Sequence, residues 1–409
     1  MKTRTVACIF VIIILRLCVQ FGIADDFDWP RWRGPNGDGI SMETDWNPLA
    51  LKGGPKILWN VDVGMGHSNV AIKDNHLYTM GRVGRDNVVF CLDADTGKEI
   101  WRHLFESSYE PQSTPTVDGK YVYALSGQGI LLCLKTKNGK VQWTKYLIKD
   151  FESPPARFGF ATSPVIEGDI VILNANTCIA LNKKTGDKVW ITEMHEKALY
   201  TDYYATPVLH ELDGRRCALI FSGRGLFSVN ILTGEKVWYY EWKIGGQPNS
   251  VDPVVVDNKV FISSCSYSRG DGVCLEIKEN EPQIIWQNKE MGNVVSTCLL
   301  INGYMYGCDG WSGCTRLRCL DFTTGDVMWD KEMQVASFIS AGGKFIILED
   351  DGTLHIAEVT PASYKEMSSC DVLDGEKKPR TFWTPPVLCN GKIYCRNNYG
   401  DLVCIDVSK

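Results

Sequence analysis

The sequence predicts an all-β protein, an eight-bladed β-propeller of four-stranded antiparallel blades. The first observation is a repeated segment: Cys91–Trp101 reads CLDADTGKEIW, and similar segments recur along the chain. The second is its period, because the closing tryptophans follow one another at spacings of 42, 42, 47, 48, 48 and 43 residues. They are Trp59, Trp101, Trp143, Trp190, Trp238, Trp286 and Trp329. A period of roughly 40–50 residues that holds about four strands is typical of a propeller blade.

Each repeated segment reads as a β-hairpin, with an apolar strand end, a polar turn and a second strand that closes on tryptophan. The turn glycines supply the positive φ that a tight hairpin requires. They are Gly97, Gly139, Gly186, Gly234 and Gly325. Because an indole offers a large apolar face and one N–H donor, we expect each tryptophan to dock on the neighbouring copy.

The blades follow in order along the chain. We expect seven of them at residues 68–105, 113–147, 162–194, 205–242, 251–290, 296–333 and 336–368, the last without a Thr-Gly turn or a tryptophan. The eighth is composite, because residues 56–64 resemble an outer strand alone and residues 384–409 resemble a blade without one. Pairing these two segments closes the ring and removes an open sheet edge.

Two segments precede the propeller of residues 56–409. Residues 1–24 have the charged start, apolar run and small residues before Asp25 of a cleaved signal peptide. This predicts a periplasmic or secreted protein; an uncleaved membrane anchor is the alternative, because Arg16 interrupts the apolar run. Residues 25–55 are rich in glycine, proline and tryptophan, and we expect an irregular strap across one face of the ring.

Charge and cysteine content exclude some classes of function. The net charge is −6 and no basic run occurs, which argues against a nucleic-acid partner. A closed ring needs no partner for stability, so we expect a monomer without a transmembrane domain after signal cleavage. Five of the 14 cysteines after residue 24 share one repeat position and are expected to be buried: Cys91, Cys133, Cys274, Cys319 and Cys404. Cys265 with Cys274, and Cys308 with Cys314, are close enough in sequence to form disulfides in an oxidising compartment. No CxxC or Cys/His cluster indicates a zinc site.

The repeat LD-x-x-TG-x-x-x-W resembles the tryptophan-docking repeat of pyrroloquinoline-quinone (PQQ)-type eight-bladed propellers, over essentially the whole mature chain. The opening WPRWRGPNGDGIS resembles exported bacterial PQQ-binding-like repeat proteins. More distantly, the repeat is similar to the propeller lipoprotein that assists outer-membrane-protein assembly and to quinoprotein alcohol dehydrogenases. The dehydrogenases of this group use PQQ, calcium and a general base. This chain has no adjacent cysteine pair and no large loop insertion, and no catalytic residue of that group can be placed on it.

Propeller geometry brings the residues before each inner strand together at one mouth of the channel, the default place for a ligand. The candidates for ligand binding are His67, Glu110, Gln112, Arg157, Phe158, Tyr203, Tyr204, Asn249, Asp252, Asn293 and Trp383. Among them, Glu110, Asn249 and Asp252 have the oxygen chemistry to hold a hard cation such as calcium, and Arg157 and Trp383 are candidate quinone contacts. The same residues have a second reading, as groups that cap loops and fill a wet channel.

Two functions follow. The leading hypothesis is an exported, non-enzymatic scaffold that binds other cell-envelope proteins or peptides. The alternative is a small PQQ-dependent alcohol or sugar dehydrogenase with calcium beside the quinone.

Overall fold

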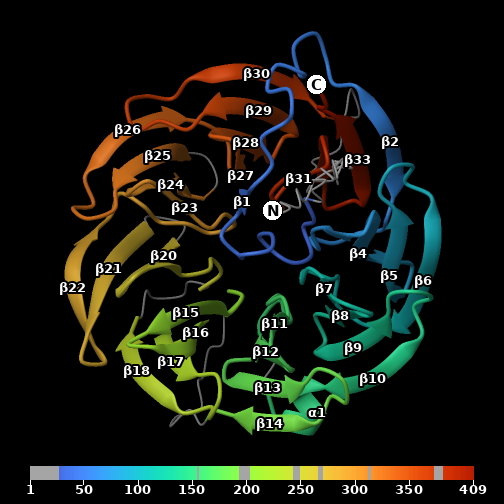
Figure 1. Cartoon of the computed structure of the whole chain (residues 1–409), viewed down its shortest axis with the longest axis vertical. Helices are drawn as coiled ribbons and strands as arrows, with labels where there is room; N and C mark the ends of the chain where they lie inside the picture. Colours follow the sequence, from blue (N-terminus) through green and yellow to red (C-terminus); the bar gives the residue numbers. More distant parts are fainter. Residues whose placement is uncertain are drawn as a thin grey trace, which may run out of the picture.

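Eight β-sheets stand radially around a central axis in the computed structural model (Figure 1). The structure describes residues 27–153, 156–192, 203–242, 249–265, 270–311, 315–372 and 381–409, and the eight sheets are counted over these residues. This confirms the prediction of an eight-bladed, antiparallel propeller. The predicted signal peptide and Cys314 lie outside the described residues.

Each blade runs from a short inner strand to an outer strand. Blade 1 is β3 (Ala71–Lys73), β4 (His76–Val83), β5 (Asp86–Asp93) and β6 (Glu99–Glu106), and blade 2 is β7 (Thr116–Asp118), β8 (Tyr121–Leu125), β9 (Ile130–Lys135) and β10 (Val141–Tyr146). Blade 3 is β11 (Val165–Glu167), β12 (Ile170–Asn174), β13 (Cys178–Asn182) and β14 (Lys188–Ile191), and blade 4 is β15 (Val208–Leu212), β16 (Arg215–Ser222), β17 (Gly225–Asn230) and β18 (Lys236–Glu241). Blade 5 is β19 (Val254–Val256), β20 (Lys259–Cys265), β21 (Gly270–Lys278) and β22 (Glu281–Asn288), and blade 6 is β23 (Leu299–Ile301), β24 (Tyr304–Asp309), β25 (Arg316–Asp321) and β26 (Val327–Glu332).

The last two blades include strands from the N-terminal part of the chain. Blade 7 is β27 (Ala336–Ala341), β28 (Lys344–Glu349), β29 (Thr353–Glu358) and β30 (Glu366–Asp371), and β1 (Ile40–Ser41) pairs with β27 in parallel. Blade 8 is β31 (Val387–Cys389), β32 (Lys392–Arg396), β33 (Asp401–Asp406) and β2 (Ile57–Asp62). The single helix among the described residues, α1 (Leu147–Phe151), has five residues, and none there has the length and apolarity to cross a membrane.

Ring closure follows the prediction. Strand β2 pairs antiparallel with β33, with Trp59 opposite Cys404 and Asp62 opposite Asp401. The first strand of the propeller body is therefore the outer strand of its last blade, and the ring needs no pairing partner from another chain at this seam.

The middle strands of the blades are mostly apolar and largely buried on both faces, because neighbouring blades cover both sides of each sheet. In β5, for example, the six residues between Asp86 and Asp93 are all buried. The outer strands are mostly exposed except at the tryptophan, as in β6, where Trp101 is buried between exposed neighbours. Burial of this kind supplies most of the free energy that holds such a fold together.

The tryptophans connect each blade to the next. Six of them donate the indole N–H to a main-chain carbonyl of the following blade at 2.7–3.1 Å: Trp59 to Ala94, Trp101 to Thr136, Trp143 to Lys183, Trp190 to Ile231, Trp286 to Phe322 and Trp329 to Thr360. Five of these rings also lie against a hairpin glycine of that blade, namely Gly97, Gly139, Gly186, Gly234 and Gly325. A Cβ at any of the five would meet an indole within 3.0 Å, so the position requires glycine for space as well as for its positive φ.

The packing of blade 7 explains why its repeat has no tryptophan in the sequence. Ser368 takes the tryptophan's place in the register, opposite Ile356. The space between blades 7 and 8 is filled instead by the N-terminal segment, whose Trp46 and Leu51 are buried in one cluster with Ile356. Because the outer hairpin of blade 8 is interrupted by the two chain ends, no Thr-Gly turn exists there for a docking indole.

The cysteines at the shared repeat position are buried, as predicted. Cys91 lies opposite Trp101, and burial raises the pKa of its thiol to about 12. The proposed disulfide between Cys265 and Cys274 is wrong, because Cys265 lies opposite Gly270 while Cys274 lies opposite Phe261 and keeps a free thiol. Cys308 also keeps a free thiol.

Candidate binding site in the central channel

A belt of hydrogen bonds runs around the channel at the start of the inner strands. In each link a main-chain N–H of one blade donates to a side-chain oxygen of the next: Asn69 to Thr114, Thr114 to Ser163, Ser163 to Thr206, Thr206 to Asp252 and Asp252 to Thr297, at 2.7–3.2 Å. The belt joins blades 1 to 6. Four of its acceptors, Thr114, Ser163, Thr206 and Asp252, each precede a proline in the sequence, and their short side-chain oxygens satisfy a buried donor of the neighbouring blade.

The N-terminal strap enters the channel rather than only crossing its face. Figure 1 shows the first described segment running across the centre of the ring. Trp32 and Arg33 line one small hollow together with Thr297, Phe338 and Pro385 from the inner parts of blades 6, 7 and 8. The guanidinium of Arg33 is buried and donates to the main-chain oxygens of Gly37, Asp38 and Cys298.

Asp252 is the point where belt and strap meet. Its Oδ1 accepts the N–H of Thr206 and its Oδ2 accepts the indole N–H of Trp32, both at 2.7 Å. The side chain is buried, which raises the pKa of Asp252, while the charges of Arg33 and Arg31 and these hydrogen bonds act in the opposite direction. Asp252 therefore serves as a structural acceptor that fixes the strap inside the ring.

Four predicted site residues at the channel mouth form one connected group. Gln112 Nε2 donates to the carbonyl of Phe158 at 2.8 Å, and the N–H of Phe158 donates to the hydroxyl of Tyr204 at 3.1 Å. The guanidinium of Arg157 lies 5.3 Å from the centre of the Phe158 ring. Arg157 and Phe158 are exposed, Phe158 at 56%. This group, from blades 2, 3 and 4, presents an aromatic and cationic surface to solvent.

A second group at the mouth joins residues from blades 1, 6 and 8. His67 stacks on Trp383 with ring centres 4.7 Å apart, and Trp311 packs on the same Trp383 at 5.3 Å. Burial, followed by the nearby charge of Arg396, lowers the pKa of His67 to about 4. His67 is therefore uncharged at neutral pH, and its imidazole packs as a neutral aromatic ring on Trp383.

The remaining candidates have structural partners. Tyr203 is buried, and Tyr204 donates its N–H to the carbonyl of Asn249. The amide of Asn249 donates to Ser222 and accepts from Ser264. Asn293 is tied in the same manner to blades 5 and 6, and Glu110 is half-buried.

A quinone with calcium does not fit these residues. The amide oxygen of Asn249 and both oxygens of Asp252 already accept protein donors, and Trp32 and Arg33 of the strap line the hollow beside blades 6, 7 and 8. In the part of the chain that the structure describes, no group of three or more His, Cys, Asp or Glu side chains is placed to hold a metal ion. We therefore derive no chemistry through PQQ or calcium.

Two residues of the channel were not foreseen from the sequence. Trp32 belongs to the strap, 220 positions before its partner Asp252, and no repeat marks it as an axial residue. Trp311 follows β24 and lies outside the repeated hairpin, so periodicity gives no signal for it. The sequence does distinguish both residues in one way: they are tryptophans that do not occupy the closing position of a repeat.

Comparison with known proteins points to one family. The family model described as "Outer membrane protein assembly factor BamB" matches residues 52–173 and 85–331, which together span more than half of the chain. The outer membrane protein assembly factor BamB of Yersinia pestis is 22% identical over 375 residues, covering 85% of this chain and 87% of that protein.

Two solved structures share the fold. The crystal structure of BamB from Moraxella catarrhalis has a TM-score of 0.64 at 15% identity, covering 86% of this chain and 99% of that chain. Quinohemoprotein alcohol dehydrogenase from Comamonas testosteroni has a TM-score of 0.65 at 12% identity, covering 93% of this chain and 80% of that chain. At these identities the two structures show the architecture alone.

Proposed function

The chain belongs to the family of outer membrane protein assembly factor BamB, and from this membership we propose that it is an exported, non-enzymatic scaffold for other cell-envelope proteins or peptides. The observation that carries the proposal is the engagement of Asp252 by Trp32 and Thr206. Asp252, the carboxylate best suited to bind a ligand in the channel, instead holds the N-terminal strap. The channel residues therefore stabilise the fold, and the exposed residues at the rim are the surface for partners.

The rim offers a suitable surface. Phe158 and Arg157 stand exposed beside Tyr204, and elsewhere at the mouth Met65 and Tyr399 are exposed at 41% and 37%. Aromatic residues, methionine and arginine are the residue types enriched at protein interfaces. The Met65 and Tyr399 segments are adjacent, because Gly66 donates its N–H to the carbonyl of Asn398. An extended segment of a partner polypeptide is the kind of ligand that such a rim accepts.

Export rests on the pattern of residues 1–24 and on the names of the relatives. We place the mature protein in the periplasm or outside the cell. Cell fractionation followed by amino-terminal sequencing tests this placement, and a mature start at Asp25 is the expected result.

The test of the scaffold function has two arms. In the first, melting with saturating PQQ and calcium is expected to leave the midpoint unchanged, and no dye is expected to be reduced with alcohols or sugars; a shift together with turnover would support the dehydrogenase instead. In the second, a photo-crosslinking amino acid at position 158 is expected to give discrete adducts in cells. The same amino acid at Leu232, which is 81% exposed away from the mouth in a hairpin turn, is the matched control, and equal adducts at both positions would contradict the proposal.

A further inference from the structure

The outer strand of blade 7, β30, is fastened differently from the other outer strands. It carries Ser368 where they carry the docking tryptophan, and Ser368 donates its hydroxyl to the carbonyl of Pro48 at 2.7 Å. Met367 and Cys370 of the same strand pack against the cluster that contains Trp46. Strand β30 therefore supports the N-terminal segment that fills the seam between blades 7 and 8, without an indole of its own.

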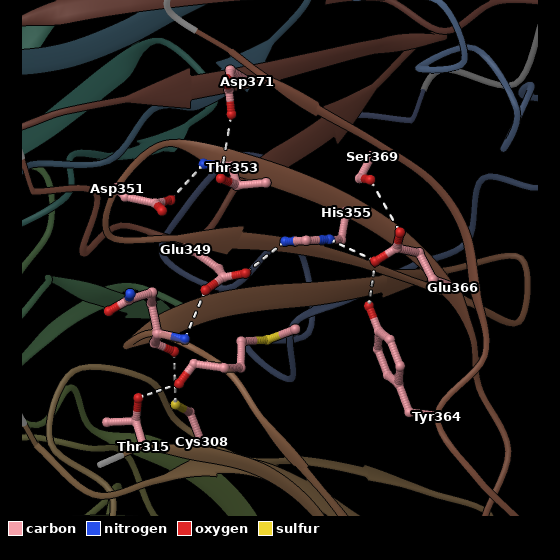
Figure 2. A network of polar contacts seen from close by, with 12 residues as sticks. Cys308, Thr315, Glu349, Asp351, Thr353, His355, Tyr364, Glu366, Ser369 and Asp371 are labelled. Atoms are coloured by element: carbon pink, nitrogen blue, oxygen red, sulfur yellow. Dashed lines mark hydrogen bonds and ion pairs between the residues drawn. The ribbon is translucent and has the colours of Figure 1, made fainter. Parts of the chain in front are cut away.

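Three side chains connect β30 to the body of its blade: Glu349 at the end of β28, His355 in β29 and Glu366 at the start of β30. We call them the His355 ladder. Figure 2 shows the imidazole between the two carboxylates, with Nε2 at 2.7 Å from Glu349 and Nδ1 at 2.8 Å from Glu366. The side chains of His355 and Glu349 are each only 12% exposed.

This geometry fixes the number of protons in the ladder. An ionised carboxylate can only accept, and a neutral imidazole has one N–H, so two such contacts require one proton more than the neutral imidazole carries. Without that proton, one ring nitrogen would turn a lone pair toward a carboxylate at less than 3 Å. The clamp is therefore complete only in its protonated form.

The groups around the ladder favour that extra proton. The second oxygen of Glu349 accepts the N–H of Gln334, and Glu366 also accepts the hydroxyls of Tyr364 and Ser369. The neighbouring Asp350 adds a further acidic group beside Glu349. Lys365, which precedes Glu366 in the sequence, pairs with Glu358 instead. From the side of blade 6, the main-chain N–H of Gln334 donates to Glu349, and the Cys308 thiol also lies near Glu349 but stays neutral, because burial raises its pKa to about 12.

We propose that the His355 ladder is a proton-dependent clamp, which adds to the main-chain pairing of β30 with β29 while it carries the bridging proton and loosens β30 when that proton is lost. Release would loosen the support that Ser368 and Met367 give to the N-terminal segment. The seam between blades 7 and 8 would then respond to the pH outside the cytoplasm, if the chain is exported as proposed. The clamp itself does not depend on that placement.

The pH range follows from the sign of each shift. Burial alone would lower the pKa of His355, but its hydrogen bonds to Glu349 and Glu366 outweigh burial and raise the pKa. The stabilisation from His355 is thus fully present below pH about 6.5 and is lost as the pH rises through the raised value. Burial would raise the pKa of Glu366, yet the hydrogen bonds from His355 and Ser369 lower it, so its contribution is lost only in acid.

The test is hydrogen exchange of β30 in the full chain, read by mass spectrometry at pH 6 and pH 9 and corrected for the base-catalysed intrinsic rate. We expect protection of β30 in the wild type to fall at least tenfold at pH 9, while β6 and the other outer strands keep theirs. In His355→Gln, β30 should exchange at pH 6 as the wild type does at pH 9. The matched control is His103→Gln, an outer-strand histidine with no carboxylate at its ring among the described contacts, and it should behave as the wild type.

Two results would overturn the clamp: β30 protection in the wild type that does not change with pH, or the same change in His355→Gln. A second measurement covers the case in which the variant fails to fold. NMR titration of ¹³C-labelled histidine in the wild type should show one imidazole that titrates above pH 6.5 in the ladder, and a His355 that titrates at or below 6.5 contradicts the proposal.

Discussion

Trp101 donates its indole N–H to the carbonyl oxygen of Thr136, 2.7 Å away in the following blade, and Gly139 lies against the face of the same ring. One hydrogen bond, one ring and one glycine thus form the joint between blades 1 and 2. The same joint recurs between other pairs of blades. A single substitution in it therefore measures how much the packing between two blades contributes to stability.

The first prediction concerns the space at Gly139. Its φ is +65°, and a Cβ there would lie 2.5 Å from Cε3 of Trp101. Gly119, in the same blade, has a φ of +54° and nothing within 4 Å of its Cβ position. Gly119→Ala should cost about 1 kcal/mol for its backbone conformation, whereas Gly139→Ala should cost roughly 2–4 kcal/mol because overpacking is added. Urea unfolding of both variants measures the difference in their free energies of unfolding. Equal losses of stability would show that the Trp101 indole moves aside for the added methyl group without cost.

The second prediction concerns Trp238, the exception among the docking tryptophans. It packs toward blade 5, whose hairpin turns on Glu279 and Asn280 instead of Thr-Gly, and its buried Nε1 has no acceptor. Trp101→Phe leaves the carbonyl of Thr136 without its donor, while Trp238→Phe removes a donor that is already unsatisfied. Both variants lose ring area, so Trp238→Phe should be about 1–2 kcal/mol less destabilising than Trp101→Phe.

Chemical unfolding of the two phenylalanine variants, followed by intrinsic fluorescence and compared at equal unfolding slopes, checks this order. A loss for Trp238→Phe that equals or exceeds the loss for Trp101→Phe would mean that the indole N–H of Trp238 finds a partner in solution.

These joints also explain which parts of the fold could be predicted. Trp101 and Gly139 are encoded locally, within one repeat and its neighbour, so their spacing predicts the blade and the closure through Trp59. The position of Trp32 depends on Asp252, more than 200 residues away, and that of Trp46 on the absence of an indole at Ser368. Such pairings are set by how the ring closes on its own N-terminal segment, and no local pattern encodes them.

For the candidate site, the sequence indicated where its residues lie but not what they do. Of the residues before the inner strands, His67 lies beside Trp383 and Gln112 beside Phe158, and their role in binding stays a prediction. The chemistry assigned to Asp252 could not be read from the sequence. Its carboxylate has the oxygens that a cation prefers, but the strap supplies a hydrogen-bond donor to it first.

The third prediction uses the stacked histidine at the mouth. Between pH 6.5 and about 4, an unfolded chain binds a proton at His67 that the folded chain does not bind, because burial lowers the pKa of His67 to about 4. Stability must therefore fall as the pH drops through this range. His67→Phe keeps an aromatic ring against Trp383 and removes the titratable group. It should therefore recover about 1–2 kcal/mol of the stability lost between pH 6.5 and pH 4.5, a value reduced from the full linkage because the imidazole is partly exposed.

The free energy of unfolding is measured at both pH values for wild type and variant. His210, whose pKa burial also lowers to about 4, leaves a residual slope in the single variant, and adding His210→Asn should reduce that slope further. An unchanged slope in His67→Phe would show that the imidazole is protonated in the folded protein and stacks on Trp383 as a cation.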